Sequence, residues 1–388
     1  MNKVIIVGGN HHNTLGVIRA FGRCGIKPYV ILTTIVSDSF VLKSKYIHKS
    51  WIMESKQVVN FLLSNFIFTE KPVLIACHDI ISSIFDSNYN VLSKYFYVPG
   101  AKEEGRISKF SEKRVMSELA INVGMNVPKY RVLCYDNVTN SLANINDVEY
   151  PCITKPIASR DGSKADICIC RTEKDLLKFL KEHLGRQFIV QTFVDKEFEF
   201  QLIGCSLDDG NNIIIPGVSI LIRPSKASNT GFLKYTTLDT SYEDVLQKSK
   251  DFIRLTSYNG LFSIEFLRDK TGVDYFMEMN FRNDGNSICV TNSGVNLPMI
   301  WYENSIGKVT IDKCVIHEEY VMPEFQELEF WYAGEISLLT MIKDFYKATS
   351  YMDYDKNDPL PTNGWKKFFK LFIRNLCVKP IKVLLNKL

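Results

Sequence analysis

The chain has 388 residues, 46% hydrophobic and 23% charged, which is enough for two or three globular domains with sizeable cores. Its net charge of +4 is uneven, because the last 25 residues carry seven basic and no acidic side chains and the rest sums to −3; this excludes a nucleic-acid-binding body. The ten cysteines form no CxxC pair, and we find no signal-peptide pattern and no transmembrane-length apolar stretch. We therefore expect a cytoplasmic protein with reduced thiols.

The first part of the chain, residues 1–105, alternates strand and helix patterns. Strands are expected at 4–7, 29–33 and 73–77, and helices at 15–24 and 57–65. This alternation predicts a parallel sheet in a Rossmann-like domain. The loop GGNHHNTLG, residues 8–16, lacks the G-x-G-x-x-G spacing, and no acid ends the second strand. A Gly-rich turn without a dinucleotide is therefore favoured over a nicotinamide site.

The middle of the chain has closely spaced strands instead. A helix is expected at 108–122, because Gly124 and Pro128 then stop it. The further strands are expected at 131–135, 150–156, 166–171, 188–194, 197–204, 212–222, 261–268 and 274–280, with helices at 173–184 and 242–258. This mixed, mostly antiparallel portion is a second architecture. The polar, turn-rich residues 352–364 are interpreted as a linker.

A lysine and a polar loop form the first candidate site. Lys155 lies late in an apolar strand, where an ammonium group needs an anion. The loop behind it contains Ser159, Arg160, Gly162 and Ser163, and glycine-containing loops can wrap phosphates with backbone N–H groups. An ordinary basic hairpin loop is the alternative.

The stretch FIVQTFVDKEFEF, residues 188–200, predicts a strand, a break after Val194 and a second strand. The peptide groups of a broken strand are free to hydrogen-bond an adenine edge. Glu197 and Glu199 point to one side, because side chains in a strand repeat every two residues. A solvated strand edge is the alternative for these two acids.

Two acids interrupt the apolar strands near residues 265 and 278. The turn-forming residues 269–272 predict a hairpin, so Glu265 and Glu278 are expected to be cross-strand neighbours. Close carboxylates raise each other's pKa, which a hard cation such as Mg²⁺ relieves, and Asn280 supplies a neutral oxygen. Arg282 follows on the same face and can clamp a phosphoryl or carboxylate group.

The order of these features resembles the ATP-grasp superfamily over roughly residues 1–310. EMNFRNDG, residues 278–285, is similar to the E-x-N-x-R stretch of its carboxylate–amine ligases, in the D-aspartate-ligase and carbamoyl-phosphate-synthase-like branch. SEKRVMSELAINVGMNVPKY, residues 111–130, resembles the entry helix of that branch, with Lys113 in a nucleotide-contacting position. Three features depart from the pattern: Gln191 replaces an acid, Phe281 replaces a proline, and the loop after Lys155 has one glycine.

The resemblance implies an α/β and α+β fold. Its parts are a Rossmann-like pre-ATP-grasp domain at 1–105, an ATP-grasp domain at 106–310 with a nucleotide lid at about 130–195 and a catalytic subdomain at about 196–310, a C-terminal extension and linker at 311–363, and an amphipathic helical tail at 364–388. It also implies an ATP-dependent carboxylate–amine ligase. ATP phosphorylates a carboxylate, an amine attacks the acylphosphate, and ADP and phosphate are released.

The resemblance further implies a role for each candidate residue. The phosphates are bound by Lys113, Lys155 and the loop residues Ser159, Arg160, Gly162 and Ser163. Gln191 and Val194 meet adenine, and Glu197 meets the ribose. Mg²⁺ is bound by Glu265, Glu278 and Asn280, and the catalytic residues are Lys155 and Arg282. The small-molecule acid and amine would be recognised around His11, His12 and Asp79 and in 223–235, with Arg223, Lys226 and Lys234, although a plain surface loop is the alternative there. A homodimer agrees with the resemblance.

The tail GWKKFFKLFIRNLCVKP, residues 364–380, has helical period. Trp365, Phe368, Phe369, Phe372 and Leu376 share one face, and Lys366, Lys367, Lys370 and Arg374 share the other. This predicts peripheral contact of residues 365–388 with the inner face of the plasma membrane, and then a lipid-linked substrate such as a cell-envelope or surface-polysaccharide precursor. A helix that packs on the body is the alternative. A nicotinamide-dependent oxidoreductase and a non-catalytic nucleotide-binding envelope protein stay open as other functions.

Overall fold

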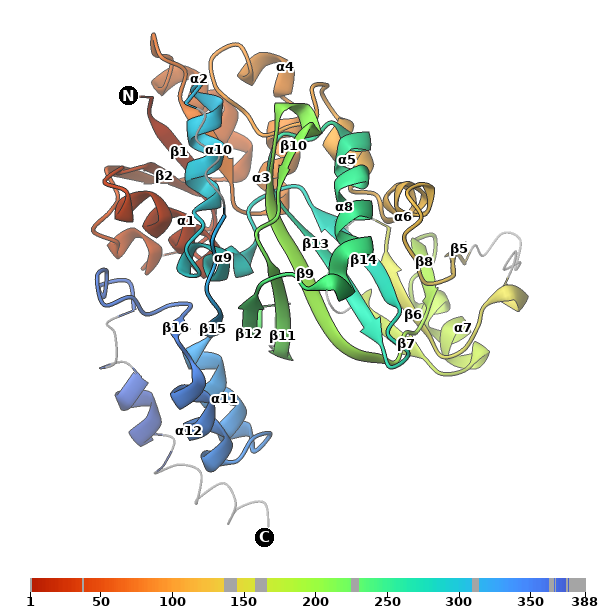
Figure 1. Cartoon of the computed structure of the whole chain (residues 1–388). Coiled ribbons are helices and arrows are strands. Elements are labelled where there is room, and N and C mark those ends of the chain that lie inside the picture. The colour runs from red at the N-terminus through yellow and green to blue at the C-terminus, as the bar shows by residue number, and fades with distance from the viewer. Residues whose placement is uncertain are drawn as a thin grey trace.

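The computed structural model describes residues 2–36, 38–135, 145–157, 166–224, 230–308, 314–362, 366, 368–374 and 376. Within these ranges the strands form three sheets with helices packed around them (Figure 1). The helices are α1 His12–Arg23, α2 Val58–Asn65, α3 Asp79–Asp86, α4 Tyr89–Leu92, α5 Arg106–Phe110, α6 Lys113–Asn122, α7 Glu173–Glu182, α8 Glu243–Thr256, α9 Ile288–Asn292, α10 Leu297–Ser305, α11 Glu324–Ala333 and α12 Leu338–Lys347. A helix that could span the membrane is not found among them.

The first sheet is parallel, with strand order β3-β2-β1-β4. Its strands are β1 Val4–Gly8, β2 Tyr29–Leu32, β3 Lys49–Ile52 and β4 Val73–Ala76. With α1–α4 it forms what we call the N-terminal lobe. β1 and β4 are buried throughout, as expected for parallel strands covered on both faces. The predicted parallel sheet is confirmed, and β3 is an additional edge strand.

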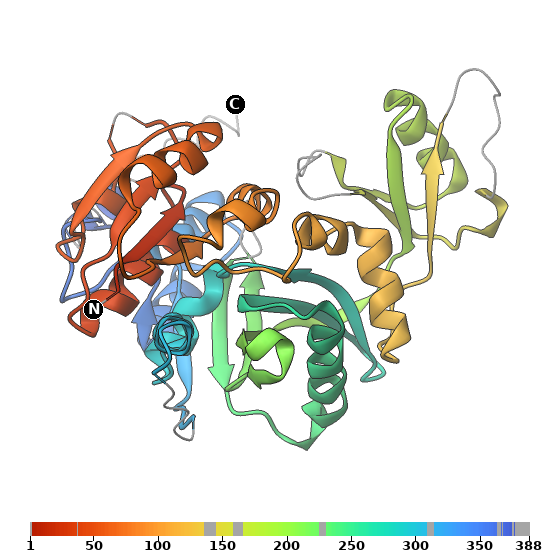
Figure 2. The ribbon, with the colours of Figure 1, turned by 90° about the horizontal axis from the view of Figure 1, so that it is seen from above.

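The second sheet is antiparallel, with strand order β5-β8-β6-β7. Its strands are β5 Tyr130–Cys134, β6 Cys152–Pro156, β7 Cys168–Cys170 and β8 Gln187–Thr192. One face is covered by α7, whose Leu176 and Leu180 pack with Phe188 in a small core of their own. Figure 2 shows this sheet and α7 standing apart from the rest of the chain, and we call them the small lobe.

The third sheet is the largest, with strand order β14-β13-β9-β11-β12-β15-β16 and β10 paired to β9. Its strands are β9 Lys196–Leu207, β10 Asn212–Ile214, β11 Val218–Pro224, β12 Gly231–Thr236, β13 Gly260–Asp269, β14 Asp274–Asn280, β15 Glu319–Met322 and β16 Ser350–Tyr351. β9 follows β8 after three residues, so the chain passes directly from the small lobe into this sheet. Phe252 and Ile253 of α8 pack on it in a core with Phe262 and Ile264.

Three predicted elements differ from the observed ones. The helix expected at 108–122 is two helices, α5 and α6, and the N–H of Lys113 at their junction donates to the Ile157 carbonyl of the small lobe, 2.9 Å away. The strand expected at 212–222 is β10 and β11, separated by the turn that contains Pro216, which has no N–H for a ladder. The described residues of the segment 223–235 are largely strand, because they include the end of β11 and most of β12.

The interpretation of residues 352–364 as a linker is wrong for their first part. Met352 and Asp358 are fully buried, and Asp355 is nearly so. The Asp358 carboxylate accepts from Arg19 Nε of α1 at 3.2 Å and from the Ser44 hydroxyl at 2.7 Å. The first part of this segment therefore packs against the N-terminal lobe. Its acidic residues serve there as partners of a buried arginine.

Candidate active site

A cleft of about 620 Å³ lies between the small lobe and the large sheet. It receives side chains from the start of α6, from β6 and β8, and from β9, β13 and β14. The lining residues are Lys113, Pro128, Ile153, Lys155, Pro156, Ile167, Ile169, Gln191, Thr192, Phe193, Val194, Lys196, Glu199, Glu265, Leu267, Met277 and Glu278. Six of the residues with a predicted site role therefore meet in one cleft: Lys113, Lys155, Gln191, Val194, Glu265 and Glu278.

Two lysines enter this cleft in different electrostatic states. Lys113, the first residue of α6, donates to Glu278 Oε2 at 3.0 Å. Burial works to lower the pKa of Lys113, but the Glu278 carboxylate outweighs it, so this pKa lies above its ordinary value. Lys155 in β6 is dominated by burial, which lowers its pKa to about 8. A buried ammonium of this kind gains most from an incoming anion.

The two predicted acids are cross-strand neighbours, as expected. Glu265 of β13 pairs in register with Glu278 of β14. Burial and the Glu278 charge raise the pKa of Glu265 to about 8, whereas Lys113 lowers the pKa of Glu278 below its ordinary value. One carboxyl of the pair is thus held neutral near pH 7 while the other is charged, and a divalent cation would allow both to ionise.

An irregularity in the hairpin adds a residue to the cleft that the sequence did not predict. Glu265 pairs with Glu278, but Phe266 pairs with Phe276, so Met277 is an extra residue on β14. Such a bulge lets consecutive side chains lie on one side of a strand. Met277 and Glu278 consequently both line the cleft.

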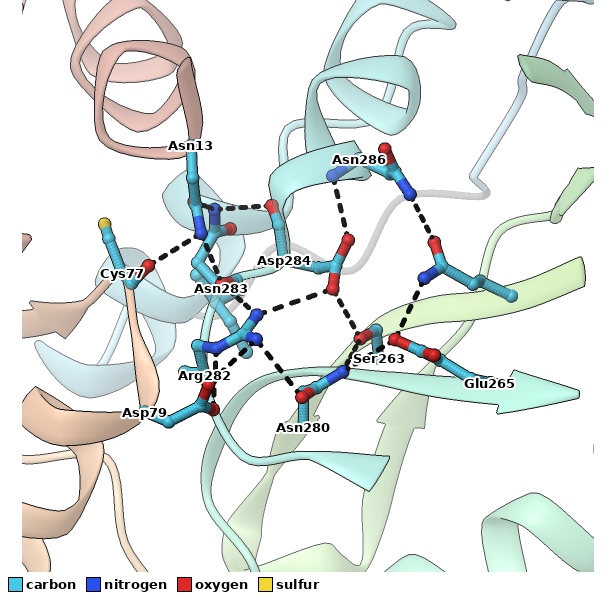
Figure 3. Close-up of polar contacts among 12 residues, drawn as sticks. Asn13, Cys77, Asp79, Ser263, Glu265, Asn280, Arg282, Asn283, Asp284 and Asn286 are labelled. Carbon is cyan, nitrogen blue, oxygen red and sulfur yellow. Dashed lines mark hydrogen bonds and ion pairs between the residues drawn. The ribbon is translucent and has the colours of Figure 1, made fainter. Parts of the chain in front are cut away.

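Asn280 and Arg282 lie beside the cleft in a polar network (Figure 3). The Asn280 amide donates to Glu265 Oε1 at 3.1 Å, and its Oδ1 accepts from Arg282 at 3.2 Å. Arg282 also donates to both carboxylate oxygens of Asp79, at 2.9 and 3.3 Å, to the Asn283 carbonyl and to Asp284. Burial works to lower the pKa of Arg282, but Asp79 and Asp284 raise it above its ordinary value.

The network continues into the N-terminal lobe. Asn13 of α1 is buried and donates to the carbonyls of Cys77, at 2.7 Å, and Asn283, at 2.9 Å. Asp79 is the first residue of α3. These contacts hold the chain after β14 against two helices of that lobe. They join residues that are 203 and 270 positions apart in the sequence.

The outer part of the cleft is apolar. Ile167, Ile169 and Phe193 are exposed and line the cleft together with Leu267 and Met277. Exposed aliphatic and aromatic side chains around a slot are typical of a site for a flat, apolar ring. Gln191 is buried on β8 in the same wall.

The structure corrects the choice between two acids. Glu197, expected to meet a ribose, is exposed and does not line the cleft, whereas Glu199 does. Glu199 forms an ion pair with Lys196, and both begin β9. Strand period predicted that the two acids share a side; only the three-dimensional position of the small lobe decides which of them it reaches.

Other predicted residues lie elsewhere. Arg223 is tied to Glu327 and Asp344, and Lys234 pairs with Glu318, so they hold α11, α12 and the β15 region rather than a substrate. His11 caps α1 by accepting from the Asn13 N–H. His12 is largely buried, which lowers its pKa to about 3. The predicted positions outside the described residues are Ser159, Arg160, Gly162, Ser163, Lys226, Trp365, Lys367 and residues 377–388 of the tail.

The donor set suits magnesium bound together with a phosphate ligand. The described part of the chain holds no group of three or more His, Cys, Asp and Glu side chains placed for a metal ion. Mg²⁺ is, however, commonly held by one or two carboxylates and the phosphates of a substrate. Glu265 and Glu278 fit this pattern. The oxygen of Asn280 currently accepts from Arg282 and would have to exchange that bond.

Comparisons with known proteins give one curated relative and many similar structures, whereas no family model matches the chain. The relative is a D-aspartate ligase of Enterococcus faecium, 24% identical over 282 residues, which are 68% of this chain and 64% of that protein. The alignment thus spans slightly under two thirds of the length of the D-aspartate ligase.

Two similar structures cover most of the chain. One is the biotin carboxylase domain dimer of the Hydrogenobacter thermophilus 2-oxoglutarate carboxylase with MgADP, at 16% identity and a TM-score of 0.65, over 82% of this chain and 73% of that one. The other is an L-amino acid ligase from Bacillus licheniformis, at 12% identity and a TM-score of 0.59, over 83% and 81%. These structural similarities show that the chain has the ATP-grasp fold. The chain order of the lysines, acids and arginine around the cleft agrees with the resemblance seen in the sequence.

Proposed function

We propose that the protein is an ATP-dependent carboxylate–amine ligase. The observation that carries the proposal is the cleft between the small lobe and the large sheet, in which two lysines and a pair of carboxylates meet beside an apolar slot. This combination matches a nucleoside triphosphate. The apolar slot suits the flat base, the lysines suit the polyphosphate, and the carboxylates suit the divalent cation. The similarity to a D-aspartate ligase and to an L-amino acid ligase supports the same reaction class.

The reaction would proceed in two steps. A carboxylate oxygen of the acid substrate takes the γ-phosphoryl group of ATP, and ADP leaves. The nitrogen of the amine then attacks the acyl carbon, phosphate leaves, and the amine loses a proton to give the amide. Positioning and neutralisation of charge supply most of the catalysis in such phosphoryl transfers.

The roles of the residues follow from their positions. Lys113 and Lys155 would hold the phosphates, and Glu265 with Glu278 would hold Mg²⁺, which neutralises phosphate charge when bound. Asn280 would complete that site. Arg282 would stabilise the transferring phosphoryl group through its planar donors.

The nucleotide contacts also follow from the walls of the cleft. Gln191 and Val194 would meet the adenine from the small lobe, with Ile169 and Met277 on its faces. Glu199 would hydrogen-bond the ribose hydroxyls. The loop with Ser159, Arg160, Gly162 and Ser163 would close over the γ-phosphate, as the resemblance implies.

The acceptor, assembly and location are finer parts of the proposal. We propose an amino acid as one substrate and a cell-envelope precursor as the other, supported by the D-aspartate ligase similarity and by the apolar and basic surface described below. A homodimer is proposed because one similar structure is described as a dimer. We propose a cytoplasmic location at the inner face of the plasma membrane.

The test is thermal denaturation of the purified chain with Mg-ATP, Mg-ADP or NAD(H). A ligand that binds only the folded state adds about 2.7 kcal/mol at 100 times its Kd, which raises Tm by several degrees. We expect a Mg²⁺-dependent shift with ATP and ADP. The variants Lys155→Ala and Glu278→Gln should lose it, whereas the matched surface variants Lys178→Ala and Glu118→Gln should keep it.

The second stage measures ADP release with panels of amino acids and carboxylates. Release that depends on both an acid and an amine would establish the ligase. A shift with NAD(H) alone would instead support the oxidoreductase, and a nucleotide shift without any substrate-dependent ADP release would support a non-catalytic nucleotide-binding protein.

A further inference from the structure

The C-terminal helix formed by the described residues of 366–376 uses only part of its apolar surface for packing. Phe368 is buried against α11 and α12, with its ring 5.1 Å from that of Phe345. The Phe372 ring stacks on Trp331 at 5.3 Å. These contacts anchor the helix to the body, so the alternative of a packed C-terminal helix holds for this side of it.

A second apolar stripe of the same helix faces away from the body. Phe369, Ile373 and Leu376 are exposed by 55%, 59% and 43%, and their spacing of four and three residues puts them on one face. Lys366, Lys370 and Arg374 repeat every four residues on the neighbouring face and are exposed as well. The single apolar face expected from the sequence is thus two stripes, one packed and one exposed.

The helix α12 lies beside the C-terminal helix (Figure 1). Its own exposed residues repeat the pattern of an apolar stripe flanked by basic side chains. Leu339, Ile342 and Tyr346, spaced by three and four residues, are exposed by 71%, 54% and 94%. Lys343 and Lys347 flank them and are also exposed. The acid of this helix, Asp344, turns the other way and pairs with Arg223 at 2.8 Å.

We propose that these two helices form one docking surface for anionic lipid bilayers. The surface, called the α12–tail face, consists of Leu339, Ile342, Tyr346, Phe369, Ile373 and Leu376 with the basic residues Lys343, Lys347, Lys366, Lys370 and Arg374. Single exposed apolar residues are ordinary, but several large ones on neighbouring helices mark an interaction site.

The charge beside the apolar stripes selects the partner. Both helices flank their exposed apolar residues with lysine or arginine, which is the composition of helices that lie in the interface of an anionic membrane. The sequence after residue 376 adds Lys379, Lys382 and Lys387 and no acid. A protein partner would not require this uniform sign. The inference does not depend on the ligase reaction.

The experiment measures co-sedimentation of the full chain with vesicles of phosphatidylglycerol and phosphatidylcholine, or of phosphatidylcholine alone. We expect binding to the anionic vesicles only, weakened by salt. The variants Leu339→Ser with Ile342→Ser on α12, and Phe369→Ser with Ile373→Ser on the tail helix, should each weaken binding roughly tenfold or more. Reversal of Lys366, Lys370 and Arg374 to Glu should weaken it roughly a hundredfold.

Matched controls are Leu255→Ser on α8 and Lys94→Glu after α4, both exposed and remote in sequence from the α12–tail face, which should bind as the wild type. Every variant should keep the Tm and the nucleotide shift of the wild type, because the substituted side chains are exposed. The proposal is overturned if the wild-type protein does not co-sediment with the anionic vesicles. An α12 variant that binds the vesicles normally also overturns it, since the tail alone would then suffice. A third contrary outcome is a wild type that does not bind vesicles but forms a dimer that the α12 variant cannot form, because the face would then be a protein interface.

Discussion

Arg282 and Asp79 form a two-bonded ion pair between the end of β14 and the start of α3, with distances of 2.9 and 3.3 Å. A guanidinium group has five N–H donors, and Asp79, Asn280, Asn283 and Asp284 together accept from all of them. The Asp79 carboxylate therefore occupies the fork that a phosphoryl or carboxylate group of a substrate would need, so the proposed role of Arg282 requires the substrate to displace Asp79.

This pair predicts different effects for its two members. Arg282→Lys should lower kcat by about a hundredfold or more, because an ammonium group cannot reproduce the planar fork. Asp79→Asn should leave kcat within a few-fold and change the free energy of unfolding by about 1 kcal/mol or less, since Asp79 is half exposed. Steady-state ADP release and urea unfolding measure both. An equal loss of kcat in the two variants would show that Asp79 itself acts on the substrate.

The pH dependence of stability should report Glu265. The pKa of this residue is about 8 in the fold and 4.5 ordinarily, because burial and Glu278 disfavour its charge. Between these values the folded chain binds one more proton than the unfolded chain, so the free energy of unfolding falls as pH rises. Glu265→Gln should flatten this decline, measured as urea midpoints from about pH 5 to 8. A profile unchanged by Glu265→Gln would contradict the assignment.

Binding of Mg-ATP should change the protonation of Glu265 and Lys155. A carboxylate ligand must lose its proton, so Mg-ATP binding near pH 7 should release a proton from Glu265. Lys155, with a pKa of about 8, should take up a fraction of a proton when phosphates raise that pKa. Calorimetry in buffers of different ionisation enthalpy separates the two: Glu265→Gln should abolish release, and ATP without Mg²⁺ should give net uptake.

The two acids at the start of β9 offer a matched pair for the nucleotide site. Glu199→Gln should weaken ATP binding by about tenfold, the value of one hydrogen bond to a charged group, because Glu199 lines the cleft. Glu197→Gln, two residues away and exposed, should leave the affinity unchanged. Nucleotide titration by calorimetry tests this. The opposite ranking would mean that the small lobe closes in a different register over β9.

The buried ion pair of Arg19 and Asp358 should matter for stability rather than activity. Their side chains are 1% and 0% exposed. Asp358→Ala leaves a buried guanidinium without its main acceptor and should lower the free energy of unfolding by about 3–5 kcal/mol. Asp38→Ala, which removes the exposed partner of Lys43, should change it by about 1 kcal/mol or less. Chemical denaturation measures both, and similar small effects would show that the 353–358 segment is only loosely attached.

Much of the cleft could be predicted because its signals are local. The strand patterns around Lys155, Glu265 and Glu278 are apolar except at those residues, and a four-residue turn fixes the hairpin that joins the acids. The parallel N-terminal sheet followed from alternating patterns in the same way. β3 was missed because its sequence, KSWI at an exposed edge, has no buried run.

The remaining features depend on tertiary structure. The bulge at Met277 is a property of the paired strands and leaves no turn residue in the sequence to mark it. The contacts of Arg282 with Asp79 and of Arg19 with Asp358 join positions 203 and 339 residues apart. The helical period of the tail identified its apolar residues, but only the position of α11 and α12 decides which of them are packed.

The Arg19–Asp358 contact also has a consequence for synthesis on the ribosome. The strands of the N-terminal lobe emerge first, and their sheet can form while the rest is still being translated. The counter-charge of Arg19 arrives only when residue 358 has left the exit tunnel. Until then α1 holds a guanidinium that must stay hydrated, so the first lobe to be made is among the last to become fully stable.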